Sequence, residues 1–543
     1  MKIFLLFPHQ LFHHLAEILR EHEINKLYLI EDPLYFGDEE RISNFNKLKL
    51  VYYRASMKYY YDHYIKKIKN IKPVYIESPK NKKYTSSIYP NINSRDEVYF
   101  YDPIDHLMEE RIKKKYEKCK NIVMLETPNF LTTRGELLDY YHTKCDERRI
   151  NHEKKLDKMT DNERHHLFKQ TNFYMWQRYR LQILLNASGK PLGGKMTYDT
   201  ENRKSIPARE KIPAIPRIGG KIIAEYIAEA REYIGRKYRE NQGNVDGEIL
   251  FPIMREDALK WFDEFLRDRL SKFGEYQDAF LKNSDPRDNR LLYHSGISPI
   301  MNIGLINPGD IISRTLTYYT RHSRAISLST IEGFLRQIIG WREHCRYTYL
   351  FAYDYMRVRN YMQHQRPLPS SFYSGTTGIR PLDDTIVRAF ETGYLHHILR
   401  LMVMGSFMLM AEIRPDDAYK WFYEFSLDSA EWNMINNVRS MALYADGGLY
   451  TTKPYIASSA YIEKMSNYGN IDDDKEKGDN KHHYKWTDIW DAFYWNFVNK
   501  NQKWIRKNGR LAMQVKYYNK KTQKEKKQYA KIFNDVMKKL MKK

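Results

Sequence analysis

Short apolar runs alternate with amphipathic stretches over the first 130 residues. The strand-length runs lie at Ile3–Phe7, Leu27–Ile30, Val74–Ile76, Val98–Tyr101 and Ile122–Leu125, and helical periodicity marks Leu11–Leu19 and Met57–Ile68 between them. Strands that alternate with helices are typical of a parallel sheet with crossover helices. We therefore predict an α/β, Rossmann-like domain with a parallel sheet over residues 1–130.

The pattern changes twice further along the chain. Residues 131–220 are charged and then rich in Gly and Pro (SIPAREKIPAIPRIGG), which predicts a few helices and a connector between domains. From Gly220 onward helical periodicity dominates, so residues 221–543 are predicted to form a large all-α domain. We expect a surface loop at 467–483 and a basic helix or frayed arm over 516–543.

Length and charge narrow the class of protein. The 543 residues exceed the roughly 250–300 at which a single core stops growing, in agreement with two domains. The formal net charge of +22 favours a polyanionic partner such as nucleic acid, although the abundance of Lys, Asn, Tyr and Ile indicates that part of it reflects an A/T-rich genome.

Few features suggest export or membrane insertion. The three cysteines, Cys119, Cys145 and Cys345, are far apart and favour a reducing compartment. The N-terminus lacks the basic flank and cleavage site of a signal peptide, and the apolar run Leu401–Met410 is shorter than the ~20 residues that span a bilayer. We expect a soluble protein without a membrane partner, in the cytoplasm or nucleus.

Candidate ligand loops follow the first two predicted strands. They read Pro8-His9-Gln10 and Glu31-Asp32-Pro33, and ligands of such sheets bind at the carboxyl ends of the strands. No GxGxxG motif follows a strand, so an ordinary dinucleotide fingerprint is absent.

Several motifs together carry a family resemblance. The helical half contains HSGISPIMNIGLI (294–306) and IEGFLRQIIGWREH (331–344), and further stretches are GGKMTYDTENRK, FGEYQDAF, ETGYLHHILRLM and MALYADGGLYTTKPYIASSAYIEKMSNY, with FPHQLF and LIEDPLYF near the start. Their order and spacing resemble the photolyase–cryptochrome superfamily, in particular its bacterial branch that usually carries an iron–sulfur cluster.

The resemblance implies an FAD site in the helical domain. Ser295 and Ser298 would hold the flavin diphosphate at a helix start, and Asn437 would face flavin N5. The full set of cofactor-binding residues implied is Tyr276, Ser295, Ser298, Arg336, Arg400, Asn437, Asp446 and Gly447. An Asn is more often a turn or cap residue, and Asp446-Gly447 also reads as an ordinary turn.

The same resemblance implies a lesion site. His397 would be the proton donor for a damaged base, with the pocket tyrosines Tyr455 and Tyr461 beside it, and Gln337 and Trp341 would line the pocket. His396 shares a helix face with Arg400, whereas His397 points about 100° away. The chain has 45 Tyr, so a structural role for either tyrosine is the alternative.

The resemblance implies an antenna chromophore, whereas the sequence argues against an iron–sulfur cluster. His9, Gln10 and Glu31 match the region where this branch binds a lumazine antenna, so a lumazine-type or other antenna chromophore is expected there. The places of the four cluster cysteines are taken by Pro381, Gly469, Asp472 and Asp488, none of which supplies a thiolate. We predict no iron–sulfur cluster and no other metal.

The function implied is light-driven repair of damaged double-stranded DNA by a monomeric photolyase, a carbon–carbon lyase. The context of His397 favours (6-4) photoproducts. The alternatives are a photolyase for cyclobutane pyrimidine dimers, a cryptochrome-like photoreceptor without repair activity, and a nucleic-acid-binding protein with a non-functional flavin site.

Overall fold

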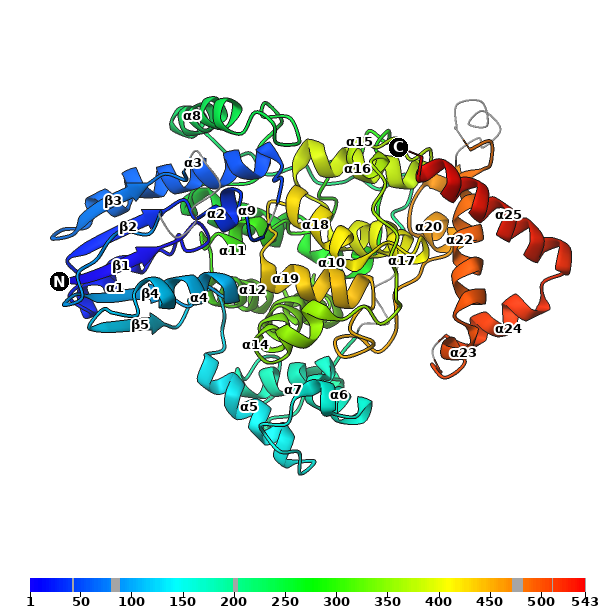
Figure 1. The fold of residues 1–543 in the computed structure, drawn as a ribbon, viewed down its shortest axis with the longest axis horizontal. Helices are drawn as coiled ribbons and strands as arrows, with labels where there is room; N and C mark the ends of the chain where they lie inside the picture. The colour runs from blue at the N-terminus through cyan, green and yellow to red at the C-terminus, as the bar shows by residue number, and fades with distance from the viewer. Residues whose placement is uncertain (42, 80–87, 199–203, 471–481, 510, 543) are drawn as a thin grey trace.

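A parallel β-sheet forms the N-terminal end of the molecule (Figure 1). The computed structural model describes residues 1–543 except 42, 80–87, 199–203, 471–481, 510 and 543. The sheet has five strands in the order β3-β2-β1-β4-β5, all parallel. They are β1 (Lys2–Leu6), β2 (Lys26–Ile30), β3 (Lys72–Ile76), β4 (Glu97–Tyr101) and β5 (Asn121–Leu125). Each predicted apolar run falls on one strand, and the α/β fold class is confirmed.

The strand order reverses direction at β1. β1 pairs with β2 on one side and with β4 on the other, and its residues Ile3 to Leu6 are buried. Strands buried on both faces require continuous apolar runs, which is why the sequence pattern identified them. The crevice between the carboxyl ends of β1 and β4 is the topological switch point of the sheet.

The helices of this domain follow the sequence prediction only in part. They are α1 (Leu15–Glu21), α2 (Pro33–Phe36), α3 (Lys47–His63) and α4 (His106–Lys115). The predicted helix at Met57–Ile68 covers only the end of α3, because α3 is buried on all sides from Leu48 to Met57 and has no polar face there. The prediction at Leu11–Leu19 begins four residues before α1.

Residues 131–220 project as a helical lobe and then a long connector. The lobe contains α5 (Arg134–Asp146), α6 (Asp161–Phe168) and α7 (Gln170–Arg180), with short 3₁₀ turns at Leu156–Lys158 and Leu192–Gly194. Among the described residues between Gly194 and Lys221 there is no helix or strand.

The remainder of the described chain is helical, as predicted. The elements are α8 (Lys221–Lys237), α9 (Arg255–Asp268), α10 (Leu270–Tyr276), α11 (Ser298–Asn302), α12 (Pro308–His322), α13 (Leu328–Leu335), η6 (Arg336–Arg342), α14 (Glu343–Val358), α15 (Ser371–Ser374), α16 (Arg380–Thr392), η7 (Leu399–Gly405), α17 (Ser406–Met410), α18 (Pro415–Phe425), α19 (Glu431–Met434), η8 (Ile435–Ala442), α20 (Ser459–Met465), η9 (Tyr468–Asn470), α22 (Trp486–Lys500), α23 (Gln502–Ile505), α24 (Ala512–Lys520) and α25 (Gln523–Leu540). Helices α22 to α25 lie at the end of the molecule opposite the sheet (Figure 1). The basic tail is therefore helical in its described part.

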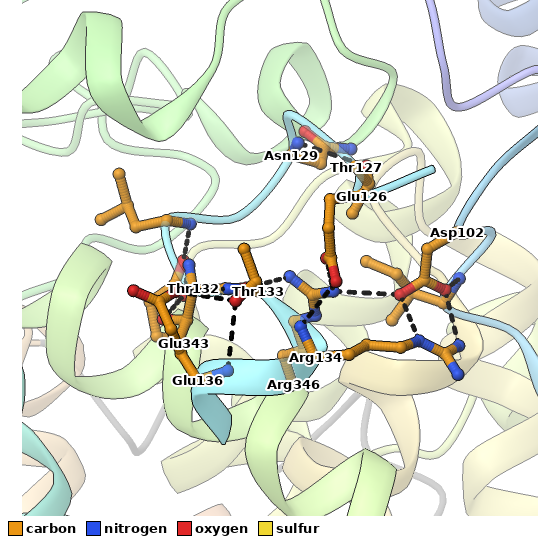
Figure 2. A network of polar contacts seen from close by, with 12 residues as sticks. Asp102, Glu126, Thr127, Asn129, Thr132, Thr133, Arg134, Glu136, Glu343 and Arg346 are labelled. Carbon is orange, nitrogen blue, oxygen red and sulfur yellow. Dashed lines mark hydrogen bonds and ion pairs between the residues drawn. The ribbon is translucent and has the colours of Figure 1, made fainter. Parts of the chain in front are cut away.

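A polar network joins the sheet to the helical domain (Figure 2). Arg346 of α14 is fully buried and donates to Asp102, at the end of β4, and to Glu126, after β5, each at 3.0 Å. Glu343 accepts from the backbone N–H groups of Leu131 (2.9 Å) and Thr132 (3.1 Å). Glu343 lies within the motif IEGFLRQIIGWREH (331–344), and its carboxylate holds this interdomain segment.

Candidate functional site

Three π-helical segments coincide with the motifs that suggested the flavin site. η6 carries Arg336, Gln337 and Trp341, η7 carries Arg400, and η8 carries Asn437. π-helices are rare and occur frequently at functional sites. A Cβ atom added to Gly405 would lie 2.7 Å from that of Ala442, so glycine permits the close contact of η7 with η8.

The carboxylate of Asp428 joins two predicted cofactor residues. It accepts a hydrogen bond from Ser298 Oγ at 2.6 Å and a bidentate pair from Arg400, at 2.9 and 3.0 Å. Burial alone would raise the pKa of Asp428, but the Arg400 charge and these hydrogen bonds hold it below its ordinary value. Ser298, Arg400 and Asp428 thus form one charged cluster, of which the sequence analysis identified two members.

The buried guanidinium of Arg342 extends this cluster. It donates to Asn302 Oδ1 at 2.6 Å, and Asn302 Nδ2 in turn donates to the carbonyl of Asp428 at 2.7 Å. The guanidinium lies over the Phe130 and Trp432 rings at 4.7 and 4.8 Å. No carboxylate of the described chain pairs with Arg342, its Nε has no partner, and burial lowers its pKa to about 10. Such a charge is suited to an anionic ligand.

Two stacked imidazoles lie at the start of the HSGISP segment. The His294 and His396 rings are 4.4 Å apart and nearly parallel. Burial lowers the pKa of His294 to about 4 and that of His396 well below the ordinary value, so both rings are neutral near pH 7. His294 Nε2 and both ring nitrogens of His396 are buried without a hydrogen-bond partner, which is unusual for polar atoms inside a protein.

His397 is the most exposed histidine of this group. Its side chain is exposed, whereas His396 is 1% exposed, so the two point to different surroundings as the sequence periodicity predicted. The surrounding protein nevertheless desolvates the His397 ring, and this effect, with the Arg400 charge, lowers its pKa to about 4. An accessible ring in desolvating surroundings fits a recessed substrate site.

Two further predicted residues keep free hydrogen-bonding capacity. The half-buried Asn437 amide and the half-buried Ser295 hydroxyl make no side-chain hydrogen bond to the part of the chain that the structure describes. The carbonyl of Ser295 accepts from Trp261 Nε1 at 2.8 Å, which fixes the backbone beside the hydroxyl. Asn436, adjacent to Asn437, instead bonds three groups of the protein and is structural.

Other predicted residues are engaged within the protein. Asp446 is buried and accepts from the backbone N–H groups of Gly448 and Tyr450, and Gly447 has φ +75° with its Cα against Tyr361, so this stretch is a tight turn. Arg336 pairs with Glu332 at 3.0 Å, and the Tyr276 ring packs at a tilt against Tyr293.

The predicted lesion residues are partly buried. Gln337 donates to the carbonyl of Gly333 at 3.3 Å, and Trp341 packs edge-on to Tyr450. Tyr455 and Tyr461 are half-buried against the core, on the segment before α20 and on α20 itself. Their assignment to a pocket stays a prediction.

The predicted antenna residues differ in how many of their polar atoms lack a hydrogen-bond partner. Gln10 is saturated by Phe7 N and Tyr101 O, and Glu31 accepts from Arg54, Tyr75 and Ser78. His9 is buried and stacks on Tyr35, and both of its ring nitrogens lack a partner. Of these three residues, only His9 retains capacity to bind a chromophore.

The donor set fits a phosphate-bearing, polar cofactor such as FAD. The fit rests on a guanidinium without a carboxylate partner in the described chain, a hydroxyl and an amide without side-chain hydrogen bonds there, and three partnerless imidazole nitrogens around the HSGISP segment. These groups would bond phosphate, hydroxyl and ring-nitrogen acceptors or donors of such a molecule.

Comparison with known proteins shows which family the chain resembles. Residues 4–249 match the family model described as deoxyribodipyrimidine photo-lyase-related protein. The chain is 35% identical over 345 residues to the (6-4) photolyase of Agrobacterium fabrum. Over residues 4–249 the chain is similar to this photolyase-related family. The alignment to the Agrobacterium photolyase covers 63% of this chain and 64% of that protein, so it spans just under two thirds of the relative.

Other relatives of this photolyase-related chain are less informative about activity. An uncharacterised protein of Acanthamoeba polyphaga mimivirus is 33% identical over 210 residues, which cover 38% of this chain and 95% of that protein. The structure of a Synechocystis cryptochrome superposes with a TM-score of 0.51 at 11% identity and covers 97% of this chain and 94% of its own. That likeness establishes the shared two-domain fold.

Two findings bear on metals and membranes. In the described ranges no group of three or more His, Cys, Asp or Glu side chains could hold a metal ion. Pro381, Gly469 and Asp488 lie in α16, η9 and α22, and Asp472 lies outside the described residues. No helix in the described part of this photolyase-related chain is both long and apolar enough to cross a bilayer.

Proposed function

We propose that this chain is a light-driven photolyase that acts on (6-4) photoproducts in double-stranded DNA. The single observation that carries the proposal is the accessible His397 ring, held in desolvating surroundings next to the Ser298–Asp428–Arg400 cluster. The 35% identity to a relative named (6-4) photolyase supports the choice of lesion.

The cofactor of the proposed enzyme is FAD. Bound FAD would supply light absorption and the electron for repair. The chain's own contribution is binding: Ser295 and Arg342 are available to the diphosphate, and Asp428 fixes Ser298 and Arg400 relative to each other. The free amide of Asn437 is available to a ring nitrogen of the flavin.

His397 would move the proton that (6-4) repair requires. At neutral pH the free enzyme holds this ring uncharged, because its pKa is lowered to about 4. A lesion with its phosphates would bring negative charge to the ring and favour its protonated, donating form. Tyr455 and Tyr461 would contact the flipped bases through their phenol groups.

The proposal extends to the antenna chromophore and the iron–sulfur cluster. His9, with partnerless ring nitrogens, is the residue most able to contact a lumazine-type or other antenna chromophore. We propose that the enzyme lacks an iron–sulfur cluster, since three cysteines cannot supply four thiolates. We also propose that the enzyme is a monomer and that it acts in the cytoplasm or nucleus.

The test is a repair assay with purified protein under blue light. The substrates are oligonucleotides with a (6-4) photoproduct or a cyclobutane dimer, and the variants are His397→Ala and His322→Ala. His322 is an exposed histidine on α12 and serves as the matched control. We expect light-dependent repair of the (6-4) substrate that falls by about 10²-fold or more in His397→Ala only.

Other outcomes lead to different functions. Repair of the cyclobutane dimer alone would make the chain a photolyase of that class. Bound flavin without repair of either lesion would favour a cryptochrome-like photoreceptor. Protein without flavin would leave a nucleic-acid-binding protein.

A further inference from the structure

More than half of the chain's net charge lies in its last 59 residues. Residues 485–543 contain fifteen Lys and two Arg against four acidic residues, a net charge of +13 out of +22. These residues form α22 to α25, at the end of the molecule opposite the sheet (Figure 1). The charge is therefore concentrated on one small module of the fold.

Helix α25 separates an apolar face from a basic face. Its buried side chains are Ile532, Phe533, Val536, Met537 and Leu540. The exposed lysines Lys524, Lys527, Lys531 and Lys538 fall within an arc of about 60° on the opposite side, at 100° per residue. We call these four residues the lysine stripe, which runs about 21 Å along the helix axis at 1.5 Å per residue.

The lysine stripe is not neutralised by the protein. None of its four lysines forms an ion pair with the described chain, whereas exposed lysines elsewhere do, as in the pairs Lys66–Asp62, Lys113–Glu109 and Lys120–Glu97. A row of like charges along one helix face repels itself unless an anion covers it.

The neighbouring helix α24 adds a stacking group. Tyr517 is 50% exposed, and the exposed Lys516 and Lys520 flank it on the same helix. Basic side chains around an exposed aromatic ring are the arrangement with which proteins bind nucleic acid.

The module is fixed to the segment that carries the candidate lesion tyrosines. Trp490 of α22 donates to the carbonyl of Ala457 at 2.9 Å, and Asp491 accepts from the N–H of Ser459 at 3.0 Å. Ala457 and Ser459 lie between Tyr455 and Tyr461. A polyanion on the module would thus be held at a set distance from these two tyrosines.

A membrane surface is a poorer partner for this helix. An interfacial amphipathic helix buries its apolar face in the lipid. The apolar face of α25 packs inside the protein, and α25 lies against α22. The exposed side offers charge with little apolar area.

We propose that α24 and α25 form a docking surface for the phosphate backbone of DNA outside the lesion site. The identity of the polyanion as DNA rests on the proposed function. The surface adds affinity for undamaged flanking duplex and does not take part in light-driven chemistry.

The test measures dark binding of the full chain to an undamaged duplex of about 30 base pairs, between about 50 and 300 mM NaCl. The variant carries Lys524→Gln, Lys527→Gln, Lys531→Gln and Lys538→Gln, which keep helix propensity. The matched control carries Lys67→Gln, Lys69→Gln, Lys114→Gln and Lys118→Gln, exposed lysines of the sheet domain without ion pairs in the described chain.

We expect the stripe variant to bind at least about tenfold more weakly near 100 mM salt. The slope of log K against log salt should become shallower by about 2 or more, because each lost phosphate contact removes about 0.9 from it. The control should change affinity by less than about twofold. Equal losses in both variants would reduce the effect to net charge and overturn the proposal.

Two further measurements distinguish DNA docking from a membrane contact and from a failure of the proposed repair activity. Unchanged DNA binding with lost binding to phosphatidylserine vesicles would make the stripe a membrane contact and overturn the proposal. If the wild type repairs no lesion but the stripe variant still loses duplex binding, the docking surface stands and the proposed repair activity fails. Circular dichroism of both variants checks that α25 still forms.

Discussion

At the scale of single residues, the candidate site is organised by one carboxylate. Asp428 fixes Ser298 and Arg400 through its side chain and Asn302 through its carbonyl. Two helices that are distant in sequence, α11 and η7, are therefore joined through one buried carboxylate. Loss of one partner of a buried ion pair leaves the other charge uncompensated and costs about 3–5 kcal/mol.

Asp428→Asn should lower FAD retention. The amide leaves the Arg400 guanidinium without its countercharge, so we expect at least about a tenfold lower flavin-to-protein ratio after gel filtration. Absorbance at the flavin band against that of the protein measures this ratio. Asp417→Asn, which removes an exposed pair with Arg414, is the control and should keep its flavin. Full flavin content in Asp428→Asn would contradict this role.

His9 should contribute to acid sensitivity. Burial lowers its folded-state pKa to about 4, whereas the unfolded value is about 6.5, so the unfolded state binds the proton first as the pH falls. The stability contributed by the neutral ring is present above pH 6.5 and is lost as the pH falls toward 4. Relative to wild type, His9→Phe should gain about 1.4 kcal/mol in unfolding free energy between pH 7.5 and 5.5.

Urea denaturation of both proteins at the two pH values measures that difference. His152→Phe, at an exposed position, serves as the matched control. A pH-independent difference between His9→Phe and wild type would mean that folding leaves the pKa of His9 unchanged.

Some residues of the candidate site could not be predicted from the sequence, because their partners are distant along the chain. Ser298, Arg400 and His397 were predicted from motifs, but Asp428 and Arg342 act through partners far away in the chain and carry no local pattern. Glu343 lies in a motif used for the resemblance, but its role could not be predicted there, because its carboxylate accepts from backbone N–H groups of residues 131 and 132, more than 200 positions earlier. Only the folded chain brings these groups together.

At the scale of elements, the crossing of two π-helices sets the geometry of the site. η7 carries Arg400, η8 carries Asn437, and Gly405 meets Ala442 where they touch. The strands were predictable because each is a continuous apolar run. The π-helical segments were not, because the sequence periodicity does not distinguish them from α-helix.

Gly405→Ala should push η7 and η8 apart. The added methyl group would lie 2.7 Å from the Ala442 Cβ, closer than packed carbon atoms approach, and overpacking of this kind costs about 1–3 kcal/mol. We expect a lower melting temperature and a lower flavin content, measured by thermal unfolding and absorbance. The double variant Gly405→Ala/Ala442→Gly removes the closest contact, leaves that of the new Cβ with the Arg400 carbonyl at 3.0 Å, and should recover part of both. Failure of the second substitution to rescue would place the strain elsewhere.

At the scale of the whole molecule, α14 couples the sheet to the helical domain. Arg346 is fully buried between Asp102, at the end of β4, and Glu126 (Figure 2). The parallel sheet and the helical remainder were both predicted from sequence, but not this joint, because its residues belong to three separate segments. The joint determines whether the two domains unfold together.

Arg346→Met should uncouple the two domains. All nine Trp lie beyond residue 175, so Trp fluorescence reports the helical part while far-ultraviolet circular dichroism reports the whole chain. We expect coincident urea transitions in wild type, and in Arg346→Met an earlier transition seen by circular dichroism, after a loss of about 3 kcal/mol or more. Arg134→Met, a more exposed partner of Asp102, should have a smaller effect. Coincident transitions in Arg346→Met would show that other contacts suffice.

A π-helical turn is an α-helix that accommodates one additional residue. The described part of the chain therefore holds three sites at which a single amino acid can be deleted while a continuous helix is retained. Each deletion would turn every following side chain of that helix by about 100°. In η6 the shift would rotate Arg342, Glu343 and Arg346 away from their partners at once. Chain length in these three turns is thus as constrained as the identity of the charged residues, and insertions or deletions should be tolerated in the connector at 195–220 long before they are tolerated here.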